Sequence, residues 1–410
     1  MYFSLFDLLL WKAQTRGAGQ KEIFAFFRDA GIKKDRVVAM QQLSYLPVDL
    51  EERAAVLSFL DMSELEVSLA MGHIPTEFRK SFFENVKQIG ALLSAENKAP
   101  EKTLVPFFKT NLGTLYNGDC LDLLRSMPDE CVDMVFADPP FNLGKMYDPG
   151  VNDSLTVSQY LNWTYEWLDG CTRILKPGGK IFIYNLPKWC VYIASHLGET
   201  LTFLNWIAVD MKFSLPIPGR LYPAHYALVS YVKGDKANTF NNQRIPMQVC
   251  RHCGGEIKDY GGYKGKMNPE GVNVSDVWSD IYPVRHKSDK NRKFNELSVK
   301  LLDRIISMST IEGDLVFDPF GGSGTTYAVA ELLKRKWIGS EIGDCEIIKQ
   351  RILSPAQDKA QLQRIYKEKN TLFTPEVEAL RIKNGFWICS TLPPDNSETD
   401  NAQMTIENFS

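Results

Sequence analysis

The stretch from Val132 to Phe141 constrains the fold of this chain more than any other part of its 410 residues. Val132-Asp-Met-Val-Phe-Ala137 is mostly apolar and rich in β-branched and aromatic side chains, which predicts a buried strand. Asp138-Pro-Pro-Phe141 follows at once, and a pair of prolines cannot continue a central strand because proline has no N–H. Ligands bind at the carboxyl ends of strands in open α/β sheets, so we expect a functional site where this strand ends.

The four residues after the strand present hydrogen-bond acceptors beside an aromatic ring. Proline rings fix the backbone, so the Asp138 carboxylate and the Pro139 carbonyl oxygen are expected on a rigid rim next to the Phe141 ring. Two acceptors and a flat ring suit an exocyclic amino group on a planar base, whose N–H groups need acceptors and whose face can stack. A plain structural turn is the alternative interpretation of the motif taken alone.

A second strand and turn follow far downstream, with Asp318 lying 180 residues after Asp138. Asp314-Leu-Val-Phe-Asp318 predicts a strand, the glycines after it predict a turn, and a helix is expected to begin near Thr325. A phosphate loop is disfavoured, because the lysine of a P-loop and the G-x-G-x-x-G pattern are both absent. Glu341 ends the next predicted strand, at a spacing where a carboxylate can meet ribose hydroxyls; a solvated surface acid is the alternative.

Asp138-Pro-Pro-Phe141 resembles the catalytic motif of the amino-group DNA methyltransferases, and the glycine-rich stretch resembles their S-adenosyl-L-methionine loop. Aspartate in the first position is typical of the N6-adenine enzymes of that family, whereas N4-cytosine enzymes more often carry serine. The catalytic motif precedes the cofactor loop, an order that resembles the circularly permuted β class. Over residues 112–355, the resemblance implies an α/β, Rossmann-like class I methyltransferase sheet, circularly permuted, with an inserted target-recognition region and an N-terminal helical module.

The resemblance implies methyl transfer from S-adenosyl-L-methionine to the N6 amino group of adenine in a flipped-out base of double-stranded DNA. Such an enzyme would serve restriction–modification or act as an orphan or phage-type enzyme. The alternatives are N4-cytosine methylation, a protein-glutamine or RNA substrate, and a catalytically silent DNA-binding module. Besides DNA, the expected partners are a cognate restriction endonuclease and a second copy of the chain.

The family's roles carry over residue by residue. The expected catalytic residues are Asp138, Pro139, Pro140 and Phe141. The expected cofactor-binding residues are Asp119, Cys120, Asp318, Phe320, Gly321, Gly322, Ser323, Gly324, Thr325 and Glu341. Asp119 is almost equally expected to be a plain helix N-cap. Lys293-Phe-Asn-Glu296 stands where the family usually has Thr-Gln-Lys-Pro, so no role is carried over to that stretch.

Composition and periodicity, together with what the resemblance implies, divide the chain into five expected parts. These are a helical module of unknown role (1–100), the catalytic half (107–233), a target-recognition insert (234–290), the cofactor-binding half (291–370) and a partly disordered C-terminal extension (371–410). Ser63 to Gly72 could belong to a helix-turn-helix that reads DNA, although packing or dimerisation is the favoured role of the helical module.

Positive charge is concentrated in the middle of the chain. Residues 212–300 hold 15 Lys and Arg against 8 Asp and Glu, whereas the whole chain has a net charge of −3. A basic segment within an acidic chain suits contact with phosphates. The expected DNA-contacting residues are Arg220, His225, Tyr226, Lys264, Lys266, Arg285 and Lys287. His225 is otherwise a hydrogen-bonded histidine near the start of a strand.

Cys250 and Cys253 have the spacing of half a zinc site, but structural zinc takes four ligands, so two free thiols are favoured and no metal is expected. The other cysteines are scattered, which fits a reducing compartment. The apolar stretch Phe3 to Trp11 is too short to cross a membrane and has no basic residues before it. We therefore expect a cytoplasmic protein without a membrane partner.

Overall fold

A nine-stranded sheet forms the centre of the computed structural model, in the strand order β1-β2-β11-β10-β3-β4-β6-β5-β9. The strands are β1 (Pro106–Lys109), β2 (Gly113–Asn117), β3 (Val132–Ala137), β4 (Leu175–Asn185), β5 (Thr202–Asp210), β6 (His225–Val232), β9 (Val277–Trp278), β10 (Leu315–Asp318) and β11 (Lys336–Glu341). The structure describes residues 4–43, 45–74, 104–143, 155–211, 215–219, 221–247, 270–282, 296–369 and 371–388, and in addition residues 78, 81, 84, 85, 88, 89, 268, 284 and 390.

The middle of the sheet is parallel. Strands β2, β11, β10, β3 and β4 run in one direction, and β6 runs antiparallel between β4 and β5. The two predicted binding strands are neighbours, with Met134 opposite Val316 and Val135 opposite Phe317. Because parallel strands present their carboxyl ends at one edge, the residues that follow β3, β10 and β11 meet there.

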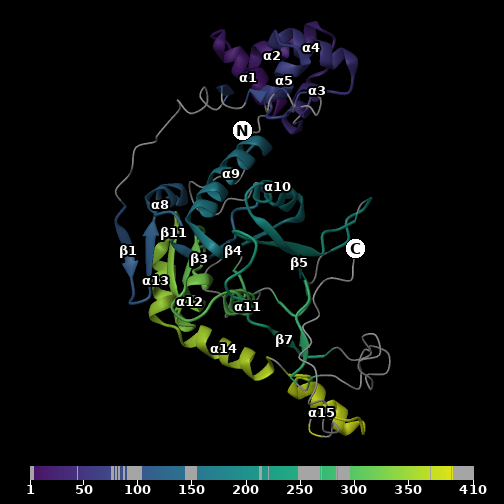
Figure 1. The fold of residues 1–410 in the computed structure, drawn as a ribbon. Coiled ribbons are helices and arrows are strands. Elements are labelled where there is room, and N and C mark those ends of the chain that lie inside the picture. Colours follow the sequence, from purple (N-terminus) through teal and green to yellow (C-terminus); the bar gives the residue numbers. More distant parts are fainter. Residues whose placement is uncertain are drawn as a thin grey trace.

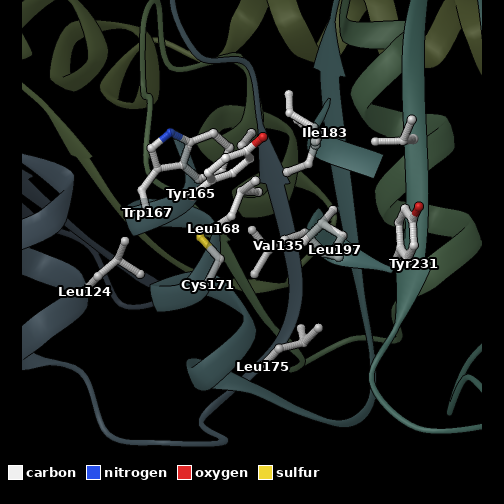
Figure 2. Packing of buried hydrophobic residues seen from close by; sticks show 14 of the residues in the cluster. Leu124, Val135, Tyr165, Trp167, Leu168, Cys171, Leu175, Ile183, Leu197 and Tyr231 are labelled. Carbon is white, nitrogen blue, oxygen red and sulfur yellow. The ribbon is translucent and has the colours of Figure 1, made fainter. Parts of the chain in front are cut away.

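Helices cover both faces of the sheet (Figure 1), and β3 alternates between two buried clusters of apolar side chains. One face carries α8 (Cys120–Ser126), α9 (Val157–Ile174) and α10 (Pro187–Leu197). The other carries α11 (Val299–Ser309), α12 (Thr325–Leu332), α13 (Cys345–Leu353) and α14 (Ala356–Glu368). Val135 faces the first cluster, where it lies near Leu168 and Cys171 of α9 (Figure 2), and Phe136 faces the second.

Helices within residues 4–74 form a unit that lies at one end of the molecule (Figure 1). It comprises α1 (Leu5–Thr15), α2 (Gln20–Asp29), α3 (Lys34–Ala39), a 3-10 turn η1 (Met40–Gln42), α4 (Leu50–Leu60) and α5 (Glu64–Ala70). Their apolar faces enclose a separate core that includes Leu9, Phe27 and Phe59. The hydroxyl of Ser158, at the start of α9, donates a hydrogen bond to Asp7 of α1 and links this unit to the sheet domain. No described helix is long and apolar enough to cross a membrane.

The sequence also predicts three element boundaries that the structure corrects. Periodicity predicts one helix from Asp344 to Lys369, but the structure has α13 and α14, separated at Pro355 because proline cannot continue an i-to-i−4 ladder. Periodicity predicts a helix from Asn295 to Met308, but α11 begins at Val299, where the Ser298 hydroxyl caps the N–H of Leu301. Lys176-Pro-Gly-Gly179 predicts a turn before a strand, but these residues are part of β4, which accommodates them through a register shift.

The C-terminal segment packs on a small ribbon made of β7 (Arg244–Ile245) and β8 (Val272–Asn273). Leu372 and Phe373, just before α15 (Pro375–Lys383), contact Met247, and the Leu372 carbonyl accepts the Met247 N–H. Residues 371–388 are therefore anchored to the segment expected to recognise the target. The tail expected to be disordered, from Pro393, lies outside the described residues.

Candidate active site

The predicted catalytic and cofactor residues meet at the carboxyl edge of the parallel strands. Asp138 follows β3, Asp318 ends β10 and Glu341 ends β11. The three carboxylates are close enough that the charges of Asp138 and Glu341 both help to raise the pKa of Asp318. Residues that lie up to 203 positions apart in the sequence therefore share one site.

Asp138-Pro-Pro-Phe141 follows β3, and two of its backbone carbonyl groups accept hydrogen bonds from side chains of neighbouring helices. The Pro140 carbonyl accepts the Tyr160 hydroxyl at 2.7 Å, and the Phe141 carbonyl accepts the Trp189 indole N–H at 2.8 Å. Within the part of the chain that the structure describes, the Pro139 carbonyl accepts no hydrogen bond. Among these residues, the Pro139 carbonyl oxygen is therefore available as an acceptor.

Three aromatic rings gather beside Asp138. The Phe141 ring lies 5.9 Å from the Tyr226 ring and 6.5 Å from the Tyr184 ring, and the two tyrosine rings are 4.9 Å apart. Burial, then the Asp138 charge, raises the pKa of both Tyr184 and Tyr226, so both hydroxyls stay protonated and can donate hydrogen bonds. Flat faces next to a carboxylate and a carbonyl can receive a planar base that carries an amino group.

The glycine-rich turn after β10 is held to the end of β11 by backbone hydrogen bonds. The Gly322 N–H donates to one Glu341 carboxylate oxygen at 2.6 Å, and the Gly343 N–H donates to the other at 2.7 Å. Gly324, at φ +77°, forms the N-cap of α12, and a Cβ atom there would come within 2.7 Å of Ile348. Both the conformation and the close approach therefore require glycine at this position.

The Asp318 side chain is buried and accepts hydrogen bonds from other residues of the protein. It is 2% exposed, and it accepts hydrogen bonds from the Thr326 hydroxyl at 2.5 Å and from the Phe320 N–H at 2.9 Å. Burial raises the pKa of Asp318 well above its usual range in spite of these donors. The Phe320 ring packs against Trp163 and Trp167 of α9, which fixes one wall of the turn.

A buried arginine supports the same turn from the far side. Arg351 forms a bidentate ion pair with Asp358 at 2.8 Å, and its remaining nitrogen reaches Glu296, Ser323 and Thr325. Ser323 and Thr325, both expected to contact the cofactor, are themselves buried. Glu296 thus supports the glycine-rich turn through Arg351.

Asp119 caps α8 by accepting the Leu121 N–H at 2.9 Å, which confirms the helix-cap interpretation. Its exposed carboxylate lies beside the buried Cys120, and burial together with the Asp119 charge strongly raises the pKa of that thiol. Cys120 is therefore a packing residue rather than a nucleophile.

The donors and acceptors at this edge fit S-adenosyl-L-methionine. The Glu341 carboxylate uses one lone pair on each oxygen for a backbone N–H, and the remaining lone pairs can accept further hydrogen bonds, such as those from hydroxyl groups. The turn from Gly321 to Gly324 has no side chains, apart from that of Ser323, that could obstruct a ligand. The Asp119 carboxylate lies at the end of the neighbouring strand β2.

Several predicted contact residues are beyond what the structure describes. Of the residues expected to touch DNA, His225 lies opposite Asp210 at the start of β6, and Tyr226 belongs to the ring cluster. Arg220, Lys264, Lys266, Arg285, Lys287, Cys250 and Cys253 lie outside the described residues. Within the described ranges, no three His, Cys, Asp or Glu side chains are grouped to hold a metal ion.

Sequence reasoning missed four residues that shape the site: Tyr160, Tyr184, Asn185 and Trp189. Helical periodicity identified Tyr160 as core, and it is buried, but periodicity does not show where a hydroxyl points. Tyr184 could have been found, because the apolar run from Lys180 to Tyr184 predicts a strand, and Tyr184 lies near its carboxyl end.

Comparisons with known proteins show what this chain is similar to. A family described as DNA methylase matches residues 132–350. The type II methyltransferase M.BamHI of Bacillus amyloliquefaciens is 54% identical, over 99% of this chain and 97% of its own length. The type II methyltransferase M.HpaI of Haemophilus parainfluenzae is 33% identical, over 57% of this chain and 72% of its own length. Among solved structures, the PvuII DNA methyltransferase (cytosine-N4-specific) aligns with a TM-score of 0.44 at 19% identity, over 64% of this chain and 93% of its own.

Proposed function

The chain belongs to the DNA methylase family, whose methyl donor is S-adenosyl-L-methionine, and on that premise we propose that it methylates an exocyclic amino group of a base in double-stranded DNA. The observation that carries the proposal is the arrangement of Asp138, the Pro139 carbonyl and the three aromatic rings at one edge of the sheet; no described residue donates a hydrogen bond to that carbonyl. This edge also holds the glycine-rich turn and Glu341.

In this proposal the protein's own residues prepare the amino group for attack. Bound S-adenosyl-L-methionine supplies an activated methyl group, and the turn from Gly321 to Gly324 with Glu341 would hold it at the edge of the sheet. The Asp138 carboxylate and the Pro139 carbonyl accept the two amino N–H bonds, which favours a more tetrahedral nitrogen and frees its lone pair. The nitrogen loses one proton after the transfer, so Asp138 need not be a strong base. The rings of Phe141 and Tyr226 stack on the flipped base and offset part of the cost of unstacking it.

Two bases carry such an amino group. Adenine N6 is the first candidate, because aspartate at position 138 resembles the N6-adenine motif. Cytosine N4 is the second, because its amino group also presents two N–H bonds and its ring a flat face, so the same acceptors and rings would suit it.

The remaining assignments belong to the same proposal. The catalytic strand β3 comes before the cofactor strand β10 in the chain, and this order supports a circularly permuted sheet. Residues 234–290 would be the inserted recognition region, and Arg220, His225, Tyr226, Lys264, Lys266, Arg285 and Lys287 would contact DNA. Similarity to type II methyltransferases supports a restriction endonuclease as a companion enzyme, and a homodimer stays part of the proposal.

The direct test is to incubate the purified chain with S-adenosyl-L-methionine and unmethylated genomic DNA, digest the DNA to nucleosides and quantify the methylated bases by mass spectrometry. N6-methyladenine supports the first candidate and N4-methylcytosine the second. The Asp138→Ala variant should bind the cofactor as before and produce neither base. The absence of both bases with the unchanged chain, or full activity of the variant, would contradict the proposal.

A further inference from the structure

Two buried side chains donate hydrogen bonds to backbone carbonyls of the Asp138–Phe141 motif, and a third buried side chain supports one of them. Tyr160 of α9 donates to the Pro140 carbonyl at 2.7 Å, and Trp189 of α10 donates to the Phe141 carbonyl at 2.8 Å. Asn185, the last residue of β4, donates its amide N–H to the Tyr160 hydroxyl oxygen at 3.1 Å. All three are at most 5% exposed, so water does not compete for these bonds.

We propose that Tyr160, Asn185 and Trp189 form a backbone clamp that sets the direction of the Pro139 carbonyl, and that they are positioning residues for methyl transfer. The inference rests on the proposed function. It concerns how the acceptor that receives the amino group is kept in place by residues that do not touch the substrate.

The dihedral angles of the motif show why such a clamp is effective. The proline rings fix φ at Pro139 and Pro140, and the second ring also restricts ψ at Pro139. The bond from Tyr160 fixes ψ at Pro140, because that angle sets the direction of the Pro140 carbonyl. The bond from Trp189 does the same at Phe141. Sequence and clamp together therefore leave almost no freedom in the backbone that carries the acceptor.

Asn185 orients the hydroxyl group of Tyr160 toward the Pro140 carbonyl. A phenol has one proton, and because the Tyr160 oxygen accepts a bond from Asn185, that proton is free to point at Pro140. The Asn185 side chain is itself oriented by the Leu186 N–H, which donates to its amide oxygen at 2.7 Å. The Tyr160 and Trp189 rings are 4.5 Å apart, so the two donors also fix each other by packing.

The test compares two tyrosines that make equivalent hydrogen bonds in different places. Tyr160→Phe removes the hydrogen bond to the Pro140 carbonyl. Tyr231→Phe is the matched control: the Tyr231 side chain is buried, 3% exposed, and its hydroxyl donates a hydrogen bond of 2.8 Å to the Ala194 carbonyl, away from the motif. For Tyr160→Phe we expect kcat to fall about ten- to a hundredfold, because small misplacements of reacting groups have effects of that size. The cofactor Kd and the KM for DNA should not change, and Tyr231→Phe should keep the kcat of the unchanged chain.

A double-mutant cycle tests whether the donors act on one backbone segment. Trp189→Phe alone should also lower kcat, and the combination with Tyr160→Phe should cost much less than the product of the two losses. The clamp would be overturned by any of three results. The loss of kcat in the double variant could equal the product of the two single losses, kcat could be unchanged in Tyr160→Phe, or Tyr231→Phe could lose as much kcat as Tyr160→Phe. If the unchanged chain methylates no base, the proposed function falls and the clamp with it; if the unchanged chain is active and Tyr160→Phe equals it, only the clamp falls.

Discussion

Glu341 is one residue with two tasks, and its hydrogen bonds allow them to be separated. Its carboxylate holds the N–H groups of Gly322 and Gly343, and in the proposed function it also accepts ribose hydroxyls. Glu341→Gln keeps the shape but turns one acceptor into a donor. We expect S-adenosyl-L-methionine to bind about ten- to a hundredfold more weakly, the usual effect of losing one hydrogen bond to a charged group.

Isothermal titration with S-adenosyl-L-methionine measures this change. Glu346→Gln, on an exposed part of α13 where Glu346 pairs with Lys349, is the matched control and should leave the Kd unchanged. Equal affinities for Glu341→Gln and the unchanged chain would exclude Glu341 from the cofactor site.

The raised pKa of the Asp318 carboxyl predicts that the stability of the fold depends on pH. Burial raises the pKa of its carboxyl well above the usual range, so the folded chain keeps a proton that the unfolded chain has lost. The stability contributed by this group is present below the unfolded pKa and is lost as the pH rises toward the folded pKa. Asp318→Asn keeps an acceptor for the Phe320 N–H and removes the titration.

The free energy of unfolding, measured in urea at several pH values, tests the sign. Asp318→Asn should gain stability relative to the unchanged chain as the pH rises from about 4 to about 8, the range above the carboxyl's ordinary pKa. A difference between the two chains that stays constant, or that shrinks with rising pH, would show that Asp318 is not the titrating group.

At the scale of elements, the turn between β10 and α12 depends on α13 and α14 through Arg351. Arg351 is buried with Asp358 and Glu296, and removing one partner of a buried ion pair leaves charges without compensation. Arg351→Met should therefore destabilise the fold by about 3–5 kcal/mol. Arg28→Met removes an arginine whose pair with Asp29 is exposed, and its cost should be below about 1 kcal/mol.

Urea unfolding of both variants provides the comparison. A small loss for Arg351→Met would mean that Glu296, Asp358, Ser323 and Thr325 find other partners and that the turn does not depend on the arginine.

Most elements of the sheet domain were predictable, and the boundaries that failed have local causes. The strands at 132–137 and 315–318 were predicted because their apolar runs end at strong chain breakers. The break at Pro355 was missed because apolar periodicity continues on both sides of it. The cap at Ser298 was missed because serine is also common inside loops.

The site was predictable in its acceptors and less so in its supports. Asp138, Pro139 and Glu341 follow strands, and position relative to a strand end can be inferred from sequence. Tyr160 and Trp189 lie on helices whose pattern indicates only that they are buried. The direction of a polar tip depends on tertiary packing, which a periodic pattern does not contain.

At the scale of the whole molecule, charge is divided between a basic middle and an acidic remainder. Residues 212–300 hold 15 Lys and Arg against 8 Asp and Glu in a chain of net charge −3. Binding to DNA should therefore be steeply salt-dependent. A protein that neutralises about six phosphates loses roughly a thousandfold in affinity between about 50 and 200 mM salt.

Fluorescence anisotropy with a labelled duplex at several salt concentrations measures the slope. Affinity for S-adenosyl-L-methionine, which involves no phosphate, is the internal control and should change far less. A DNA affinity that is independent of salt would remove the basic segment from the interface.

The pairing of β3 with β10 has a consequence for how the protein is made. Val135 pairs with Phe317 in the sheet, and Phe317 is synthesised 182 residues after Val135. During synthesis, β3 therefore cannot pair with β10 until that later part of the chain has left the ribosome. At ordinary rates of synthesis this delay is on the order of ten seconds or longer, during which one edge of the mostly apolar strand β3 has no partner. A growing chain in this state offers a template for strand exchange with its neighbours. Cells that make this protein rapidly should therefore depend on chaperones that bind nascent chains, and a chain that stops before β10 should aggregate rather than form a smaller domain.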